Sequence, residues 1–137
     1  MQQQLPKPRV LVVDEVKRSL RLAHAFLMQE YEVTACETVA EALDLLQREA
    51  FHVLVASHHL HAMNVFDLAT RARQAQPHLH CLVVSATTPP HDQTMNRPYI
   101  LAIKAPYHPA TMLMLMERLV IAGEQVAEKL YNSNPNR

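Results

Sequence analysis

Arg9-Val-Leu-Val-Val-Asp-Glu15 is the stretch that decides the fold of this chain. Its apolar residues suit a strand that is buried on both faces, as the strands of a parallel sheet are, and an acidic pair ends the run. From Val16 to Gln29 the apolar residues recur at helical spacing, which predicts a helix directly after the strand. A buried strand followed by an amphipathic helix is the first unit of an alternating α/β fold.

The same alternation continues through the rest of the chain. Short apolar or β-prone runs predict four further strands, at 32–36, 53–56, 81–84 and 100–103. Thr38 and Glu41 form a capping box, Asn64 can cap the next helix, and Pro109 suits the first turn of the last helix. Five strands that alternate with helices predict an α/β fold with a doubly wound, five-stranded parallel sheet of order 2-1-3-4-5.

The segment from Ala86 to Tyr99 breaks this rhythm. Its prolines, Pro89, Pro90 and Pro98, exclude a helix interior, so we expect the fourth helix to be shortened or lost and the segment to be a mobile loop. We place one domain at 9–122, after a disordered N-terminal segment at 1–8. Residues 123–137 leave room for an extension of the last helix, which Gly123 weakens, and for a disordered tail.

The composition indicates an ordinary globular domain. Of the 137 residues, 49% are hydrophobic, and basic and acidic residues number 13 each. Nucleic-acid binders usually have an excess of basic residues, which this chain does not have. No apolar run reaches the ~20 residues that cross a membrane. The polar start of the chain carries no secretory signal, so we expect a cytoplasmic protein. Cys36 and Cys81 lack metal-ligand spacing and are expected to be buried free thiols.

Five polar residues lie where strands of the predicted sheet end, namely Asp14, Glu15, Ser57, Ser85 and Lys104. Ligands of doubly wound sheets bind outside the carboxyl ends of the strands, so these residues should meet in one pocket. We expect the ammonium group of Lys104 to lie beside one of the two carboxylates. Two carboxylates could hold magnesium only weakly, and we predict no other metal or cofactor.

Three motifs, in order at these strand ends, make the chain resemble the receiver domains of response regulators, the CheY-like family with a flavodoxin-like fold, over about residues 9–122. Val12-Val-Asp-Glu15 is similar to the acidic pair that helps receivers to hold magnesium. Ser85-Ala86 is similar to the Thr/Ser-Ala pair that contacts the phosphoryl group, and Lys104 to the lysine that neutralises its oxygens. The resemblance implies a bacterial module of two-component signal transduction, in contact with a protein partner such as a sensor kinase or an effector domain.

The central receiver motif is broken in this chain. The resemblance places Ser57 where receivers carry the aspartate that accepts the phosphoryl group. A serine hydroxyl cannot form an acyl phosphate and is a weak nucleophile without an adjacent base. Leu101 stands in the place of the family's switch aromatic residue, and Ala105, not proline, follows the lysine. Phosphoryl transfer from a histidine kinase is therefore not expected.

We predict a pseudo-receiver that is not an enzyme and that acts as a phosphorylation-independent protein-interaction module, with homodimerisation left open. The alternative is a flavodoxin-like domain that binds a small molecule or a metal ion at the strand-end pocket. His58, His59 and His61 follow the third strand, but adjacent histidines point apart and match no helical metal motif. We expect these side chains to be exposed and able to titrate near neutral pH.

Overall fold

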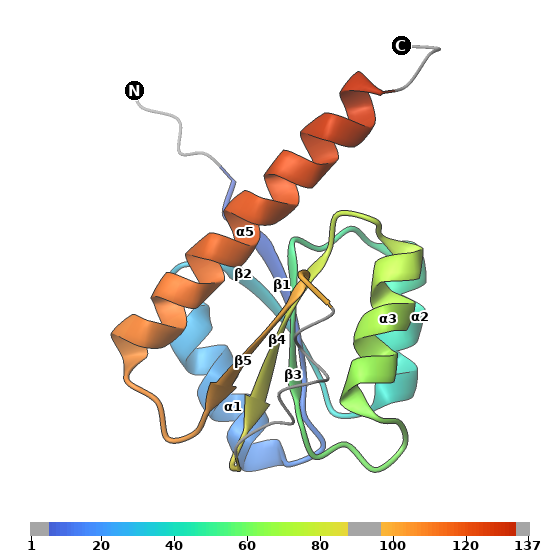
Figure 1. Cartoon of the computed structure of the whole chain (residues 1–137). Helices are drawn as coiled ribbons and strands as arrows, with labels where there is room; N and C mark the ends of the chain where they lie inside the picture. Colours follow the sequence, from blue (N-terminus) through green and yellow to red (C-terminus); the bar gives the residue numbers. More distant parts are fainter. Residues whose placement is uncertain (1–5, 88–96, 134–137) are drawn as a thin grey trace.

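The computed structural model describes residues 6–87 and 97–133, in which strands and helices alternate as predicted as far as the fourth strand (Figure 1). The five strands are β1 (Arg9–Val13), β2 (Glu32–Cys36), β3 (Val53–Ser57), β4 (His80–Ser85) and β5 (Ile100–Lys104). The four helices are α1 (Lys17–Leu27), α2 (Val39–Arg48), α3 (Val65–Ala75) and α5 (Pro109–Asn132).

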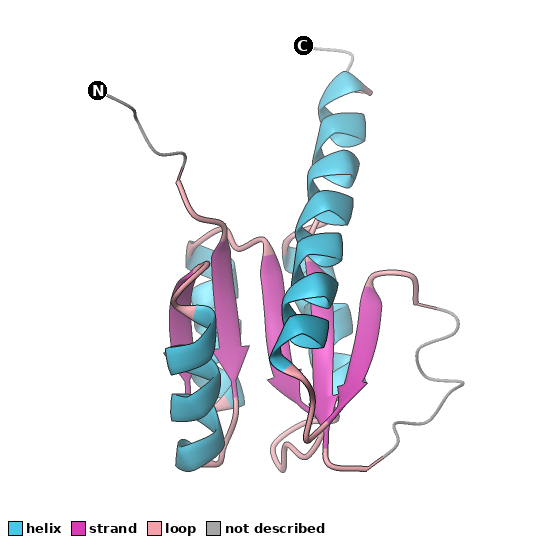
Figure 2. Ribbon diagram, turned by 90° about the vertical axis from the view of Figure 1, so that its left-hand side faces the viewer, coloured by secondary structure: helices cyan, strands magenta, loops and turns pink. Residues whose placement is uncertain are grey.

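The sheet has the predicted topology. All neighbouring strands are parallel, and their order is β2-β1-β3-β4-β5. Helices α1 and α5 cover one face of the sheet, and α2 and α3 cover the other (Figure 2). One layer of buried apolar side chains fills each of the two spaces between sheet and helices. The central strands β1 and β3 are apolar on both faces because they lie between these layers.

Capping residues position the helices as the sequence predicts. The backbone N–H of Glu41 donates to Thr38 Oγ1 at 3.1 Å at the start of α2, and that of Phe66 donates to Asn64 Oδ1 at 2.8 Å at the start of α3. Pro109 occupies the first turn of α5. None of the described residues has a positive φ, so the connections in this part of the chain avoid the conformation that favours glycine.

Helix α5 is the longest element of the fold. It passes residue 122, where we placed the end of the domain, and continues through Gly123 to Asn132, so that its last turns project beyond the sheet (Figure 1). The described part of the chain has no helix between β4 and β5, and most of the predicted mobile loop, 88–96, lies outside the described residues, as do 1–5 and 134–137. No helix in the described ranges is long and apolar enough to cross a membrane.

Both cysteines are buried free thiols, as predicted. Cys36 ends β2 and Cys81 lies in β4, so β1 and β3 separate the strands that carry them. Burial raises the pKa of the Cys36 thiol to about 11 and that of the Cys81 thiol to about 12. Both groups therefore remain protonated, and poor nucleophiles, at neutral pH.

The buried histidine at the start of β4 should make the stability of the domain depend on pH. Nδ1 of His80 donates to the carbonyl oxygen of His78 at 2.9 Å, and burial lowers the pKa of this imidazole from its ordinary 6.5, although the bond to His78 raises it. Below pH 6.5 the unfolded state therefore binds more protons than the folded state. As the pH is lowered from 6.5, the free energy of unfolding decreases until the pH passes the pKa of His80 in the folded state.

As the pH is lowered through this window, the free energy of unfolding of wild type should fall by up to about 1.4 kcal/mol per pH unit more than that of His80→Gln. This is the slope that uptake of one proton produces. Urea unfolding at a series of pH values from about 8 to about 5.5 measures the difference, in which all other titrating groups cancel. Parallel curves for the two proteins would contradict the prediction.

Candidate functional site

The register of the parallel strands brings the predicted site residues to one edge of the sheet. Val13, the last residue of β1, is level with Ala56 in β3, and Ser57 is level with Val84 in β4. Ser85 and Lys104 are level with each other at the ends of β4 and β5. The side chains of Asp14, Glu15, Ser57, Ser85 and Lys104 thus all start from the carboxyl edge, as the alternation of strands and helices predicts.

The two carboxylates after β1 have different surroundings. Asp14 is half-buried, and its Oδ1 accepts a hydrogen bond from the backbone N–H of Val16 at 2.9 Å. Burial raises the pKa of Asp14 above its ordinary value, although the Val16 hydrogen bond lowers it and the nearby charge of Glu15 raises it. No described basic residue forms an ion pair with this carboxylate, and so it keeps an oxygen available to a ligand.

Glu15 is held by the loop that follows β3. Its Oε1 accepts from the backbone N–H of His61 at 2.6 Å and lies 3.0 Å from Nδ1 of the same residue. These hydrogen bonds from His61, the backbone one first, lower the pKa of Glu15 below its ordinary value. The carboxylate is therefore ionised at neutral pH and is already engaged by the chain itself.

The serine that ends β3 has no base beside it. Ser57 Oγ accepts a weak hydrogen bond from the backbone N–H of His59 at 3.3 Å. No described His, Asp or Glu side chain is within hydrogen-bonding distance of this hydroxyl. A serine without an adjacent base is a weak nucleophile, so the geometry offers no activated group at this strand end.

Ser85 lies at the centre of a small hydrogen-bonded group. Its buried hydroxyl lies 2.9 Å from Nδ1 of His58 and 3.3 Å from the hydroxyl of Thr87, and it accepts from the backbone N–H of Thr87 at 3.1 Å. Burial lowers the pKa of His58, and the neighbouring His59 lowers it further. The imidazole of His58 is thus neutral at neutral pH, and the hydroxyl of Ser85 has its hydrogen-bonding capacity used within the protein.

The expected contact between Lys104 and a carboxylate is wrong. Lys104 is exposed, and among the described residues it forms no ion pair with Asp14, Glu15 or any other acid. Strands β3 and β4 separate β5 from β1, and Glu15 contacts His61 in its place. An exposed ammonium group gains little from such a pair relative to full hydration, so the side chain stays in water.

The residues at the strand ends do not fit a magnesium ion as receivers hold it. Magnesium prefers carboxylate oxygens in near-octahedral geometry. Here Glu15 is occupied by His61 and Ser57 supplies a hydroxyl at the third place, so Asp14 is the one carboxylate of this site that keeps an oxygen available. Among residues 6–87 and 97–133, no group of three His, Cys, Asp or Glu side chains is placed to hold a metal ion. The donor set thus does not support even the weak magnesium site that we expected at Asp14 and Glu15.

The histidines after β3 are the site residues that the sequence did not predict. The ring of His61 is exposed as expected, yet it contacts Glu15, and the ring of His58 is half-buried against Ser85 and edge-on to Phe66. The ring of His59 contacts that of His58 in a tilted arrangement, with 4.9 Å between the ring centres. Their place directly after a strand at the carboxyl edge was the one available signal, since that edge is where the other polar residues meet.

Comparison with known proteins places the fold. No family model and no curated protein matches the sequence. Among solved structures, a CheY-like response regulator receiver domain protein from Methanospirillum hungatei is similar at 20% identity, with a TM-score of 0.76 over 87% of this chain and 98% of that one. The signal receiver domain of an HD domain-containing protein from Pseudomonas fluorescens has a TM-score of 0.81 at 18% identity, over 93% and 97% of the two chains.

A protein from Rhodopirellula baltica that is named an adenylate cyclase has a TM-score of 0.80 at 20% identity, over 93% of this chain and 99% of that one. At these identities the similarity establishes the shared architecture. The chain has the CheY-like, flavodoxin-like fold of receiver domains, with five parallel strands in the order 2-1-3-4-5 and four described helices.

Proposed function

We propose that this protein is an atypical receiver domain that works in two-component signal transduction as a phosphorylation-independent protein-interaction module. The observation that carries the proposal is the pair of contacts from the loop after β3, His58 to Ser85 and His61 to Glu15. These contacts occupy the side chains of Glu15 and Ser85, which a receiver would need for metal and phosphoryl oxygens. In addition, Ser57 at the end of β3 supplies a hydroxyl where a receiver needs a carboxylate. The proposed role is non-enzymatic and cytoplasmic.

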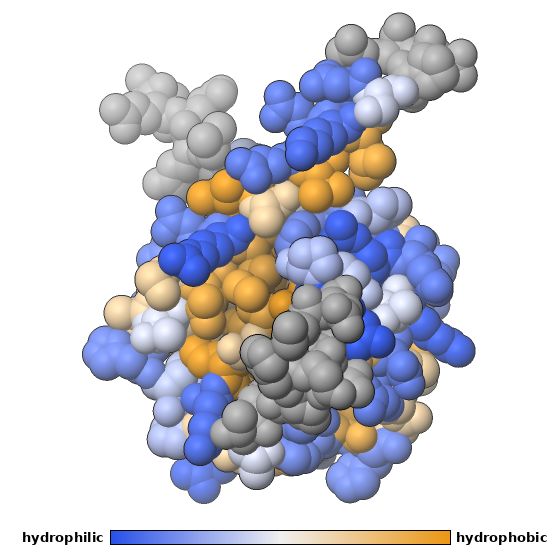
Figure 3. Space-filling view, in the orientation of Figure 1, coloured by the Kyte–Doolittle hydropathy of each residue, from blue (hydrophilic) through white to orange (hydrophobic). Residues whose placement is uncertain are grey.

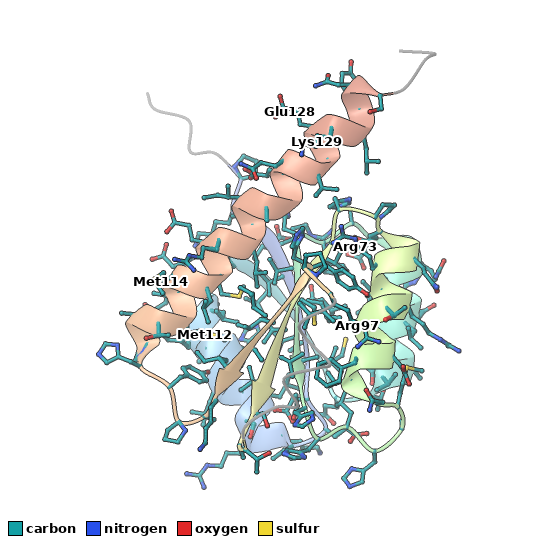
Figure 4. All side chains as sticks on the ribbon, in the orientation of Figure 1. Arg73, Arg97, Met112, Met114, Glu128 and Lys129 are labelled. Atoms are coloured by element: carbon teal, nitrogen blue, oxygen red, sulfur yellow. The ribbon has the colours of Figure 1, made fainter. Side chains whose placement is uncertain are left out.

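Exposed apolar side chains on α5 support a role in binding a protein. Met114 and Ile121, about two turns apart on α5, are about half exposed, and Figure 4 shows Met114 pointing away from the sheet. Figure 3 shows apolar surface that runs from α5 over the region of β5, whose Leu101 is half-buried. Exposed apolar patches on soluble domains mark interaction sites, so a sensor kinase, an effector domain or a second copy is proposed to bind there.

The test of the proposal is treatment with acetyl phosphate. Because Ser57 offers a hydroxyl with no adjacent base, mass spectrometry of the treated protein should show no phosphoryl adduct. A receiver with an intact aspartate, treated in parallel, provides the positive control. An adduct on this domain would overturn the phosphorylation-independent function.

Replacing Ser57 by aspartate should restore part of a metal site. A second available carboxylate beside Asp14 should increase the affinity for magnesium about tenfold, as measured by isothermal titration calorimetry. Ser133→Asp adds the same charge at the far end of α5 and should leave the affinity at the wild-type value. Equal magnesium binding by Ser57→Asp and wild type would show that Ser57 does not occupy the place of the receiver aspartate.

A further inference from the structure

A cavity of about 410 Å³ opens at the carboxyl edge of the sheet, between α1 and the connection from β5 to α5. Val12, Val55 and Val84 line it on the side of the sheet, and Leu22 of α1 and Tyr107 line the two flanks. The volume lies within the roughly 300–1,000 Å³ of pockets that bind small molecules. The cavity is therefore large enough for a ligand with one ring or a short chain.

Short side chains leave this space unfilled. Ala23, Ala86 and Ala105 line the cavity where longer side chains would close it, while Met112, which points from α5 toward the sheet in Figure 4, is fully buried beside them. At the rim, Val16 is 58% exposed and Leu22 is 64% exposed. Aliphatic side chains left in water beside an apolar cavity gain free energy when a ligand covers them.

The cavity also has a polar end. Asp14 and Ser57, at the ends of β1 and β3, line it together with His59 from the loop after β3. The carboxylate of Asp14 has one hydrogen bond, from Val16, and no cationic partner among the described residues. Burial raises its pKa, which indicates that the ionised form lacks full solvation. A ligand with a hydrogen-bond donor or a positive charge would give the carboxylate of Asp14 the second partner that the described residues do not provide.

We propose that this cavity binds a small amphipathic amine. The apolar body of the ligand packs against Val12, Val55 and Leu22, and its protonated amino group donates to the carboxylate of Asp14 and to Ser57 Oγ. A charge-assisted hydrogen bond in a partly buried place is stronger than a neutral one, which gives the site its preference for a cationic head group. A ligand with a carboxylate head group would meet the negative charge of Asp14.

This inference goes beyond the proposed function and does not depend on it, because ligand binding needs neither a protein partner nor phosphorylation. Phenethylamine is a suitable probe, and phenethyl alcohol and hydrocinnamate have the same ring with a neutral and an anionic head group. We expect phenethylamine to bind saturably in a two-dimensional amide NMR titration of the whole chain. The shifted amides should belong to residues 14–23 and 105–112, and hydrocinnamate should bind about tenfold more weakly or not at all.

Two substitutions separate the head group from the body of the ligand. Asp14→Asn should weaken phenethylamine about tenfold and leave phenethyl alcohol unchanged, while Asp67→Asn, on the far face of the molecule, should change neither. Leu22→Ala should weaken both probes, with Met28→Ala, at the end of the same helix, as the matched control. Leu22 is exposed, so its removal should leave the thermal unfolding midpoint near that of wild type.

The proposal is overturned if no amide shifts saturably, if hydrocinnamate binds as tightly as the amine, or if Asp14→Asn binds the amine as wild type does. Should Asp14→Asn fail to fold, unchanged binding of both probes by Leu22→Ala overturns it as well. If the same amides shift on raising the protein concentration without any probe, the occupant is a second copy of the chain and not an amine. The acetyl phosphate test measures phosphorylation and not ligand binding, so failure of the proposed function and failure of this proposal can be told apart.

Discussion

Replacing Gln76 by alanine should lower the free energy of unfolding by about 3 kcal/mol or more, because it would leave three backbone groups without partners at about 1–3 kcal/mol each. Gln76 follows α3 and is buried. Its Oε1 accepts from the backbone N–H of Phe51 at 2.9 Å, and its Nε2 donates to the carbonyl oxygens of Leu46 at 2.9 Å and Glu49 at 2.6 Å. One side chain thus holds the connection between α2 and β3.

Urea denaturation measures this loss through the midpoint, provided that the slope stays constant. Gln76→Met keeps the length of the side chain without its polar atoms, and it should still cost about 2 kcal/mol if the hydrogen bonds carry the effect. Gln74→Ala, at an exposed position near the end of α3, should stay within about 0.5 kcal/mol of wild type. A loss below about 1 kcal/mol for Gln76→Ala would contradict the assigned role.

Replacing Gly123 by valine should also destabilise the domain strongly, by about 3 kcal/mol, the upper part of the range for overpacking. A Cβ atom at this position of α5 would lie 2.9 Å from the carbonyl oxygen of His78, 3.5 Å from Nδ1 of His80 and 3.8 Å from the carbonyl oxygen of His52. The backbone oxygen of His78 cannot move aside as the end of a flexible side chain can. Either α5 or the connection before β4 would have to shift.

The smaller substitution makes this prediction sharper. In an exposed helix, alanine in place of glycine stabilises by about 1 kcal/mol, whereas the contact with His78 makes Gly123→Ala destabilising here. Ala127→Val, at an exposed position one turn later, should cost no more than about 0.7 kcal/mol from helix propensity. Thermal and urea unfolding of the three variants give the comparison. If Gly123→Ala proves as stable as wild type, the close approach of α5 is wrong.

Local patterns in the sequence were sufficient to predict the architecture. The apolar run at 10–13 and its counterparts favour strands that are buried on both sides, and their alternation with helices favours a parallel sheet between two layers of helices. Thr38, Asn64 and Pro109 start helices through contacts with residues next to them in the chain. Such signals can be read from a sequence because the interacting groups are close together in it.

The same topology placed the strand-end residues at one edge, but it could not show their hydrogen-bonding partners. The contact of His58 with Ser85 spans 27 positions, and that of His61 with Glu15 spans 46. Both depend on the path of the loop after β3, which no periodic pattern specifies. The expected pairing of Lys104 with a carboxylate failed for the same reason, since adjacency at an edge does not set the direction of an exposed side chain.

By itself, then, the sequence determined the order of the elements, the parallel sheet and the residues at its carboxyl edge, because each follows from burial and from contacts between near neighbours. Only the tertiary structure decided the roles of Gln76 and Gly123. In the sequence Gln76 is only a polar residue near the end of a predicted helix. In the structure its three hydrogen bonds join backbone groups at least 25 positions away. Gly123 reads as a weak point of a helix, and its function is to let α5 approach the backbone of His78, a distance that exists only once the sheet and the helix have packed.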